Sequence, residues 1–160
     1  MKKQFLAVAL SSIMFLIYGC SSTQPIQSVT AETTLITFFD HLNENQFEKA
    51  VTLFSADELD WETLNTYSAD EEKKDKAKVL EAFCNATQTC LKLEVLSTTK
   101  NSEDDYTFTV QFKEKDGSIM KYGPFNGVEN DPTPPQTKFE YNVKKVGDLY
   151  KVITSPLYRP

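Results

Sequence analysis

The chain has 160 residues, which is enough for one domain with a buried core. Its 17 basic and 23 acidic residues give a net charge of −6. A surface of this sign repels the phosphate backbone, which excludes nucleic acid as a partner.

The first 19 residues predict an export signal. Lys2 and Lys3 form a positive start, and an apolar stretch over residues 5–17 follows them. This is the pattern of a secretory signal peptide. The apolar stretch covers about 13 residues, whereas a membrane-spanning helix needs roughly 20. We therefore expect a cleaved signal rather than a transmembrane anchor.

The signal ends in the sequence LIYGC, whose last residue is Cys20. This ending resembles the lipobox of bacterial lipoproteins, although Tyr18 is bulkier than the usual residue there. The resemblance implies cleavage before Cys20, a diacylglycerol on its sulfur and acylation of the new amine. Residues 1–19 are then the signal peptide, residues 20–29 a lipidated tether and residues 30–160 a single domain.

The lipid predicted on Cys20 decides the expected location. Two or more acyl chains anchor a protein stably to a bilayer. Without Lys2 and Lys3 the charge becomes 15 − 23 = −8, so the lipid rather than the surface has to hold the protein at the membrane. Ser21 carries no acidic retention signal, which by the same resemblance favours the outer membrane, on its periplasmic or surface side, if the source is Gram-negative. The sequence thus predicts a protein of the cell envelope.

Helices are expected from residue 30 to about residue 88. Apolar residues recur there at helical spacing. They are Leu35, Phe38, Phe39 and Leu42, then Phe47, Ala50, Val51 and Phe54, and finally Ala77, Leu80, Phe83 and Cys84. Three pairs fit the capping-box pattern, namely Asn45 with Glu48, Ser55 with Glu58, and Ser68 with Glu71. Several start signals so close together predict separate short helices.

From residue 91 the apolar period changes to two, which predicts strands. The candidate strands are residues 91–96, 106–112, 118–122, 139–143 and 149–154. Short turns at Asp116-Gly117 and Gly147-Asp148 leave no room for crossovers, so the strands are expected to be antiparallel. The predicted fold class is α+β, with N-terminal short helices packed on an antiparallel sheet of about four to five strands.

The stretch TLITFFDHLNENQFEKAVTLF, residues 34–54, resembles the opening of nuclear transport factor 2-like domains. In those domains a helix with an aromatic pair leads through a short polar turn into a second helix. The resemblance implies a cone, in which a curved sheet wraps around a long helix and often leaves an apolar pocket. A cystatin-like domain is the other interpretation of this order. The acid–base residues of the family's enzymes have no matching positions here.

Cys84 and Cys90 are the two cysteines that remain after lipidation of Cys20. Paired thiols of exported proteins tend to close, so we expect a structural disulfide. Zinc binding would need more ligands than His41, the only histidine, adds. A redox pair would more often have the spacing C-x-x-C. Two separately buried thiols are the remaining alternative.

The sequence contains no recognisable catalytic or metal-binding motif. His41 follows Asp40, and neighbours on a helix point about 100° apart rather than toward each other. No serine lies in G-x-S-x-G or S-x-x-K. The acidic clusters at residues 57–60, 70–72 and 103–105 lack the spacing of a calcium loop. We expect no catalytic residue, no cofactor and no metal.

Three aromatic residues are candidate ligand or partner contacts. Trp61 and Tyr67 share one face of a short helix and either cap the core or line a pocket or partner surface. Phe125 lies in the loop over residues 123–136, which is rich in proline and glycine, and either contacts a partner or folds back on the sheet.

The function expected from the sequence is a membrane-anchored, non-enzymatic binding or interaction module. One alternative is a protein that binds a small apolar ligand in the cone. Another is an immunity-like or envelope-assembly factor that binds an envelope protein. An enzyme with its site in the pocket has the weakest support, because no catalytic motif accompanies the fold.

Overall fold

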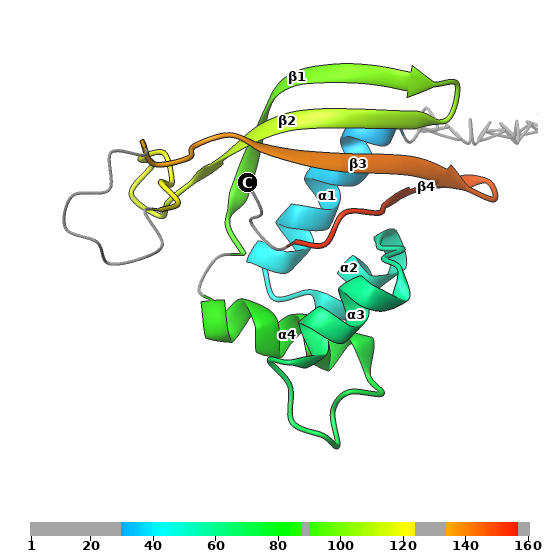
Figure 1. The fold of residues 1–160 in the computed structure, drawn as a ribbon, viewed down its shortest axis with the longest axis vertical. Coiled ribbons are helices and arrows are strands. Elements are labelled where there is room, and N and C mark those ends of the chain that lie inside the picture. Colours follow the sequence, from blue (N-terminus) through cyan, green and yellow to red (C-terminus); the bar gives the residue numbers. More distant parts are fainter. Residues whose placement is uncertain (1–29, 88–89, 124–133, 157–160) are drawn as a thin grey trace, which may run out of the picture.

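The computed structural model describes residues 30–87, 90–123 and 134–156 (Figure 1). The predicted signal peptide, the tether with Cys20, and Phe125 lie outside these residues. The helices are α1 (Ala31–Asn43), α2 (Phe47–Leu53), α3 (Glu58–Asn65) and α4 (Lys76–Thr87). The strands are β1 (Lys92–Ser102), β2 (Asp105–Lys113), β3 (Phe139–Val146) and β4 (Leu149–Val152).

All neighbouring strands are antiparallel, and the sheet has the order β1-β2-β3-β4. The sheet curves over α1, while α2, α3 and α4 lie beyond the C-terminal part of that helix (Figure 1). The predicted α+β class, with short helices first and a curved antiparallel sheet after them, is confirmed. None of the helices in the described residues is both long enough and apolar enough to cross a bilayer.

Helix α1 forms the centre of the core. Its N-terminus is capped by Thr30, whose hydroxyl oxygen accepts a hydrogen bond from the Thr33 N–H at 3.1 Å. The predicted apolar stripe is buried, and the ring of Phe39 lies 5.2 Å from that of Phe112 and 5.0 Å from that of Tyr141. These rings join the helix to β2 and β3, so aromatic side chains fill the space between α1 and the sheet.

The three predicted capping pairs were wrong about where helices begin. Asn45 adopts a left-handed conformation, φ +59°, and ends α1 instead of starting α2. The N–H of Gln46 donates to the carbonyl of His41 at 2.8 Å, and that of Asn45 donates to Leu42 at 3.2 Å. This is the Schellman arrangement, in which the last helical carbonyls gain partners. Helix α2 starts after Gln46 without a side-chain cap.

The next two helices start later than their predicted pairs. For α3 the cap is Asp57, which accepts from the Asp60 N–H at 2.8 Å, rather than Ser55. For α4 the carboxylate of Asp75 accepts from the Ala77 N–H at 3.0 Å, so the capping residue lies seven residues after Ser68 (75 − 68 = 7) and the helix begins at Lys76. Aspartates rather than the predicted serines cap both helices. A charged carboxylate accepts a hydrogen bond from a helix N–H group more strongly than a neutral hydroxyl does.

The sheet has four strands because residues 118–122 do not form one. The turn predicted at Asp116-Gly117 is present, with Gly117 at φ +85°. Beyond it, a bridge joins Lys113 to Ile119, and the Met120 N–H donates to the Phe112 carbonyl at 2.9 Å. Strand β1, in contrast, runs six residues further than predicted, through polar sequence to Ser102 (102 − 96 = 6).

The two edges of the sheet differ. The edge of β4 meets the α2–α3 connection, where Phe54 bridges to Val152 and the Ser55 N–H donates to the Val152 carbonyl at 2.8 Å. The Lys151 ammonium group also donates to the Thr52 carbonyl. Within the described ranges, β1 pairs only with β2 and leaves its outer edge open.

Candidate functional site

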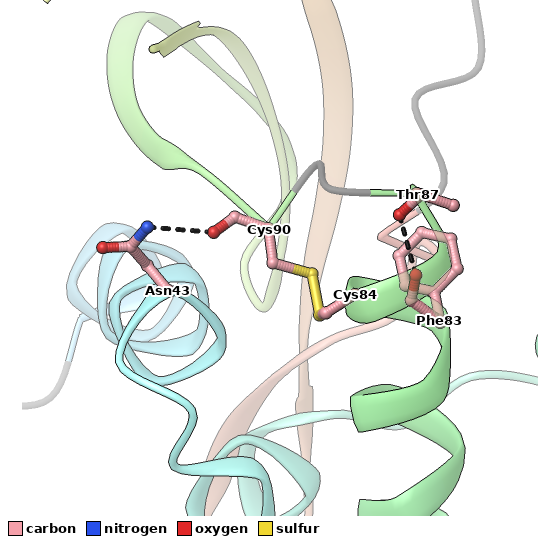
Figure 2. Close-up of a disulfide and its surroundings, with 5 residues drawn as sticks. All are labelled: Asn43, Phe83, Cys84, Thr87 and Cys90. Carbon is pink, nitrogen blue, oxygen red and sulfur yellow. Dashed lines mark hydrogen bonds between the residues drawn. A yellow bond between two sulfur atoms is a disulfide. The ribbon is translucent and has the colours of Figure 1, made fainter. Parts of the chain in front are cut away.

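A disulfide joins Cys84, near the end of α4, to Cys90, just before β1, with Cα atoms 5.3 Å apart (Figure 2). The pairing agrees with the one expected from the sequence. The side chain of Asn43, the last residue of α1, donates to the Cys90 carbonyl at 3.0 Å. On α4, beside the bridge, the Thr87 hydroxyl donates to the Phe83 carbonyl at 2.8 Å (Figure 2). Three elements, α1, α4 and β1, are therefore fastened at one point.

Next to this bridge, the described residues form a surface hollow with a volume of about 790 Å³. We call it the disulfide hollow. Buried Leu42 and Leu91 form its apolar floor, and polar groups surround them. The remaining lining residues are Asn43, Asn45, Cys84, Asn85, Cys90, Glu114, Lys115 and Asp116. An apolar centre with a polar rim is the usual anatomy of a binding surface.

The chemistry of the disulfide hollow is that of hydrogen bonding. The amides of Asn45 and Asn85 can each both donate and accept. On the opposite rim, the Asp116 carboxylate accepts from the Ser118 hydroxyl at 2.7 Å and from the Ser118 N–H at 2.9 Å. These hydrogen bonds lower the pKa of Asp116 below its ordinary value, so the carboxylate is charged at neutral pH.

The second hollow lies at the other end of α1 and has a volume of about 390 Å³. We call it the tyrosine hollow, because Tyr106 and Tyr150 form one wall with their rings 5.9 Å apart. Interaction with the Tyr106 hydroxyl raises the pKa of Tyr150 above its ordinary value. The other lining residues are Thr30, Ala31, Glu32, Thr98 and Phe108.

The predicted contacts Trp61 and Tyr67 lie in neither hollow. Trp61 packs edge-on against Phe54 at 5.2 Å, and the Lys76 ammonium group lies 4.7 Å from its ring centroid. Tyr67 is 40% exposed and meets the ring of Phe83 at 5.3 Å. Both aromatic residues have core partners, which favours the interpretation that they cap the core.

His41 lies in the last turn of α1 and is half-buried. Its Nδ1 atom is buried and has no hydrogen-bond partner among the described residues, so no carboxylate orients the ring through that atom. In the same part of the chain, no three His, Cys, Asp or Glu residues lie close enough together to hold a metal ion.

The disulfide hollow was missed by sequence reasoning, apart from its two cysteines. Its lining comes from the end of α1, the end of α4, the start of β1 and the turn after β2. Asn45 had been interpreted as the start of a helix. The close spacing of Cys84 and Cys90 was the only sequence feature that pointed to this hollow. A short disulfide loop marks the point where the helices end and the strands begin.

Comparison with known proteins gives one fold likeness to report. It is to a crystal structure from Campylobacter jejuni described as a candidate NTF2-like transpeptidase, with 13% sequence identity and a TM-score of 0.44. The match covers 79% of this chain and 99% of that chain. No protein-family model matches the chain, and no curated protein matches it either. The fold class above therefore rests on the elements themselves.

Proposed function

We propose that this protein is a lipid-anchored, non-enzymatic binding module of the cell envelope, and that the disulfide hollow receives another protein. One observation carries the proposal. Helix α1 is capped by Thr30, where the tether would arrive, and its last residue, Asn43, lines the hollow. A helix of 13 residues is about 20 Å long, so the hollow faces away from the end that leads to the anchor.

The hollow suits a protein partner for two reasons. Its amides and its Asp116 carboxylate match the backbone and polar side chains of another chain, and its leucine floor offers a small apolar contact. The disulfide and the Asn43 hydrogen bond hold this surface rigid before any partner arrives. A rigid surface loses little conformational entropy on binding, which favours affinity.

The packing weighs against an apolar ligand in the cone. Phe38, Phe39, Phe112 and Tyr141 occupy the space between α1 and the sheet, and each is no more than 1% exposed. A ligand there would have to displace side chains that pack against one another. The apolar-ligand alternative therefore has less support than a surface partner.

Catalysis also has little support. The transpeptidase activity named for the Campylobacter protein would need an activated nucleophile, and the thiols of Cys84 and Cys90 are both consumed by the disulfide. His41 has no group that orients it through Nδ1 in the described part of the chain.

The anchor is tested with Cys20→Ala in growing cells. Labelling with a palmitate analogue should mark the unsubstituted chain and leave the variant unmarked, because the variant lacks the sulfur that takes the diacylglycerol. Equal labelling of the two chains would contradict the lipid anchor.

The binding surface is tested by pull-down from envelope extract. Asn85→Arg puts a bulky charge on the exposed rim of the hollow and should abolish capture of the partner. Thr66→Arg adds the same charge at an exposed position after α3, outside both hollows, and should capture as much as the unsubstituted chain. Loss in both variants, or in neither, would contradict a partner in this hollow.

A further inference from the structure

The end of the molecule that carries the tyrosine hollow also carries two hairpin turns. Thr30 and Ala31 line that hollow together with Tyr106 and Tyr150. Tyr106 follows the β1–β2 turn and Tyr150 follows the β3–β4 turn. The start of α1 and both turns therefore lie at one end of the fold, which we call the hairpin end (Figure 1).

The hairpin end exposes a pair of apolar side chains. Val146 and Leu149 are cross-strand partners on either side of the Gly147-Asp148 turn. They are 47% and 55% exposed, although their size would favour burial. Tyr106 and Tyr150 lie at the same end but on the opposite face of the sheet, because side chains alternate along a strand, and each has a partly buried ring and a hydroxyl group. Exposed apolar tips and tyrosines at one end of a fold are typical of surfaces that sit at a membrane–water interface.

The charge of the hairpin end differs from that of the rest of the chain. Residues 100–106 and 144–151 contain four lysines and four carboxylates, and Glu32 at the start of α1 adds a fifth carboxylate, so the net charge of this end is 4 − 5 = −1. One oppositely charged pair, Lys145 and Asp104, lies 4.0 Å apart. Of the −8 of residues 20–160, −7 is thus carried elsewhere. Anionic headgroups would repel the other surfaces more strongly than this one.

The tether restricts how far the hairpin end can move from the anchor. Ten residue steps separate Cys20 from Thr30 (30 − 20 = 10). Fully extended, they span at most about 36 Å, so Thr30 and the groups around it stay within that distance of the lipid on Cys20.

We propose that the hairpin end rests on the bilayer, with Val146 and Leu149 inserted among the headgroups of a zwitterionic lipid surface. The proposal depends on the lipid anchor proposed above. The contact fixes the domain upright, so that α1 points away from the membrane and the disulfide hollow faces the partner. Tyr106 and Tyr150 occupy the interfacial layer, where an apolar ring and a hydroxyl are both accommodated.

The experiment uses the full lipidated chain on phosphatidylethanolamine-containing vesicles made with or without brominated acyl chains, which quench tryptophan. Trp61, on α3, is the natural reporter for the far side, since it is the only tryptophan. In the Trp61→Phe background, Leu149→Trp places the reporter at the hairpin end. Its emission should be lost on brominated vesicles, whereas the emission of Trp61 in the unsubstituted chain should be retained.

Flotation of the chain with the vesicles tests the lipid anchor separately from the membrane contact of the hairpin end. A chain that does not float has no anchor, and the proposed function fails. A chain that floats while its introduced tryptophan is not quenched overturns the membrane contact alone, and so does quenching of Trp61 in the unsubstituted chain. If Leu149→Trp folds poorly, Val146→Trp is the second variant. Quenching of either introduced tryptophan can also be measured in a chain that keeps Trp61, as a partial loss of the total emission.

Discussion

The Asn43 side chain donates a hydrogen bond to the Cys90 carbonyl, 47 residues further along the chain and 3.0 Å away. Cys90 is thereby held twice, once through its sulfur by α4 and once through its carbonyl by α1. The first strand starts two residues later, so this one residue transmits the position of two helices to the sheet.

Asn43→Ala should lower the free energy of unfolding by about 1 kcal/mol, the usual value of such a bond when the acceptor stays partly buried. Urea unfolding of the purified domain measures it. The matched control is Asn85→Ala, which removes an exposed amide from the same hollow and should change stability by less than about 0.5 kcal/mol. A loss of equal size in both variants would mean that the hydrogen bond contributes nothing specific.

Replacing Cys84 and Cys90 with alanine should cost about 2 kcal/mol, because the bridge closes a short loop and restricts the unfolded chain only modestly. The domain should still fold, with a lower urea midpoint. Alkylation in urea without reductant supplies the independent check. If both thiols react before reduction, the cysteines are not paired.

Phe39→Ala should destabilise the domain by about 3–5 kcal/mol, as aromatic truncations in packed cores do. The side chain is 1% exposed and touches rings from β2 and β3. Leu59→Ala removes a side chain that is 66% exposed and should be nearly silent. Comparable melting temperatures for the two variants would contradict a core centred on α1.

Trp61→Ala distinguishes a core cap from a partner contact. Loss of its packing on Phe54 and of the Lys76 contact should lower stability by about 2 kcal/mol, less than for a fully buried ring. Partner capture at low temperature should not change. An unaltered melting temperature together with lost capture would show that Trp61 belongs to an interface.

Stability should decrease in acid partly through Glu94. Hydrogen bonds from Lys113 and Gln111 lower the pKa of Glu94 below 4.5, its ordinary value. The unfolded chain then binds the proton more readily than the folded one, so the contribution is complete above pH 4.5 and is lost as the pH falls through the lowered pKa. Urea midpoints measured across this range for the unsubstituted chain and for Lys113→Met give the test. The variant should show the weaker pH dependence, and identical profiles would contradict the interaction.

Periodicity predicted the elements well where a buried face exists. The stripe from Leu35 to Leu42 and the alternation from Phe108 to Phe112 are both core positions, because burial on one face leaves its period in the sequence. The polar half of β1, ending at Ser102, was not predicted. The side chains of this half are exposed, and backbone pairing with β2 stabilises it. The sequence therefore shows no alternation of apolar and polar residues there.

The helix boundaries and the disulfide hollow could not be predicted from short sequence patterns, because both depend on the three-dimensional arrangement of the chain. The pattern Asn45-x-x-Glu48 fits a helix start, yet the same asparagine also suits the left-handed residue that ends a helix, and here the second use prevails. The disulfide hollow needs Asn45, Asn85 and Asp116 side by side. Only the closed fold brings them together, so no local spacing indicates it.

The unequal edges of the sheet have a consequence for self-association. Growth of a fibril by strand addition requires every subunit to offer two open edges, one for each neighbour. In the described part of this chain, Phe54 and Ser55 occupy the edge of the short strand β4 at its last residue, Val152, whereas β1 leaves a long outer edge free. Two molecules can join through β1 and thereby use up the free edge of both. Strand-to-strand association of the folded protein through β1 therefore ends at a pair.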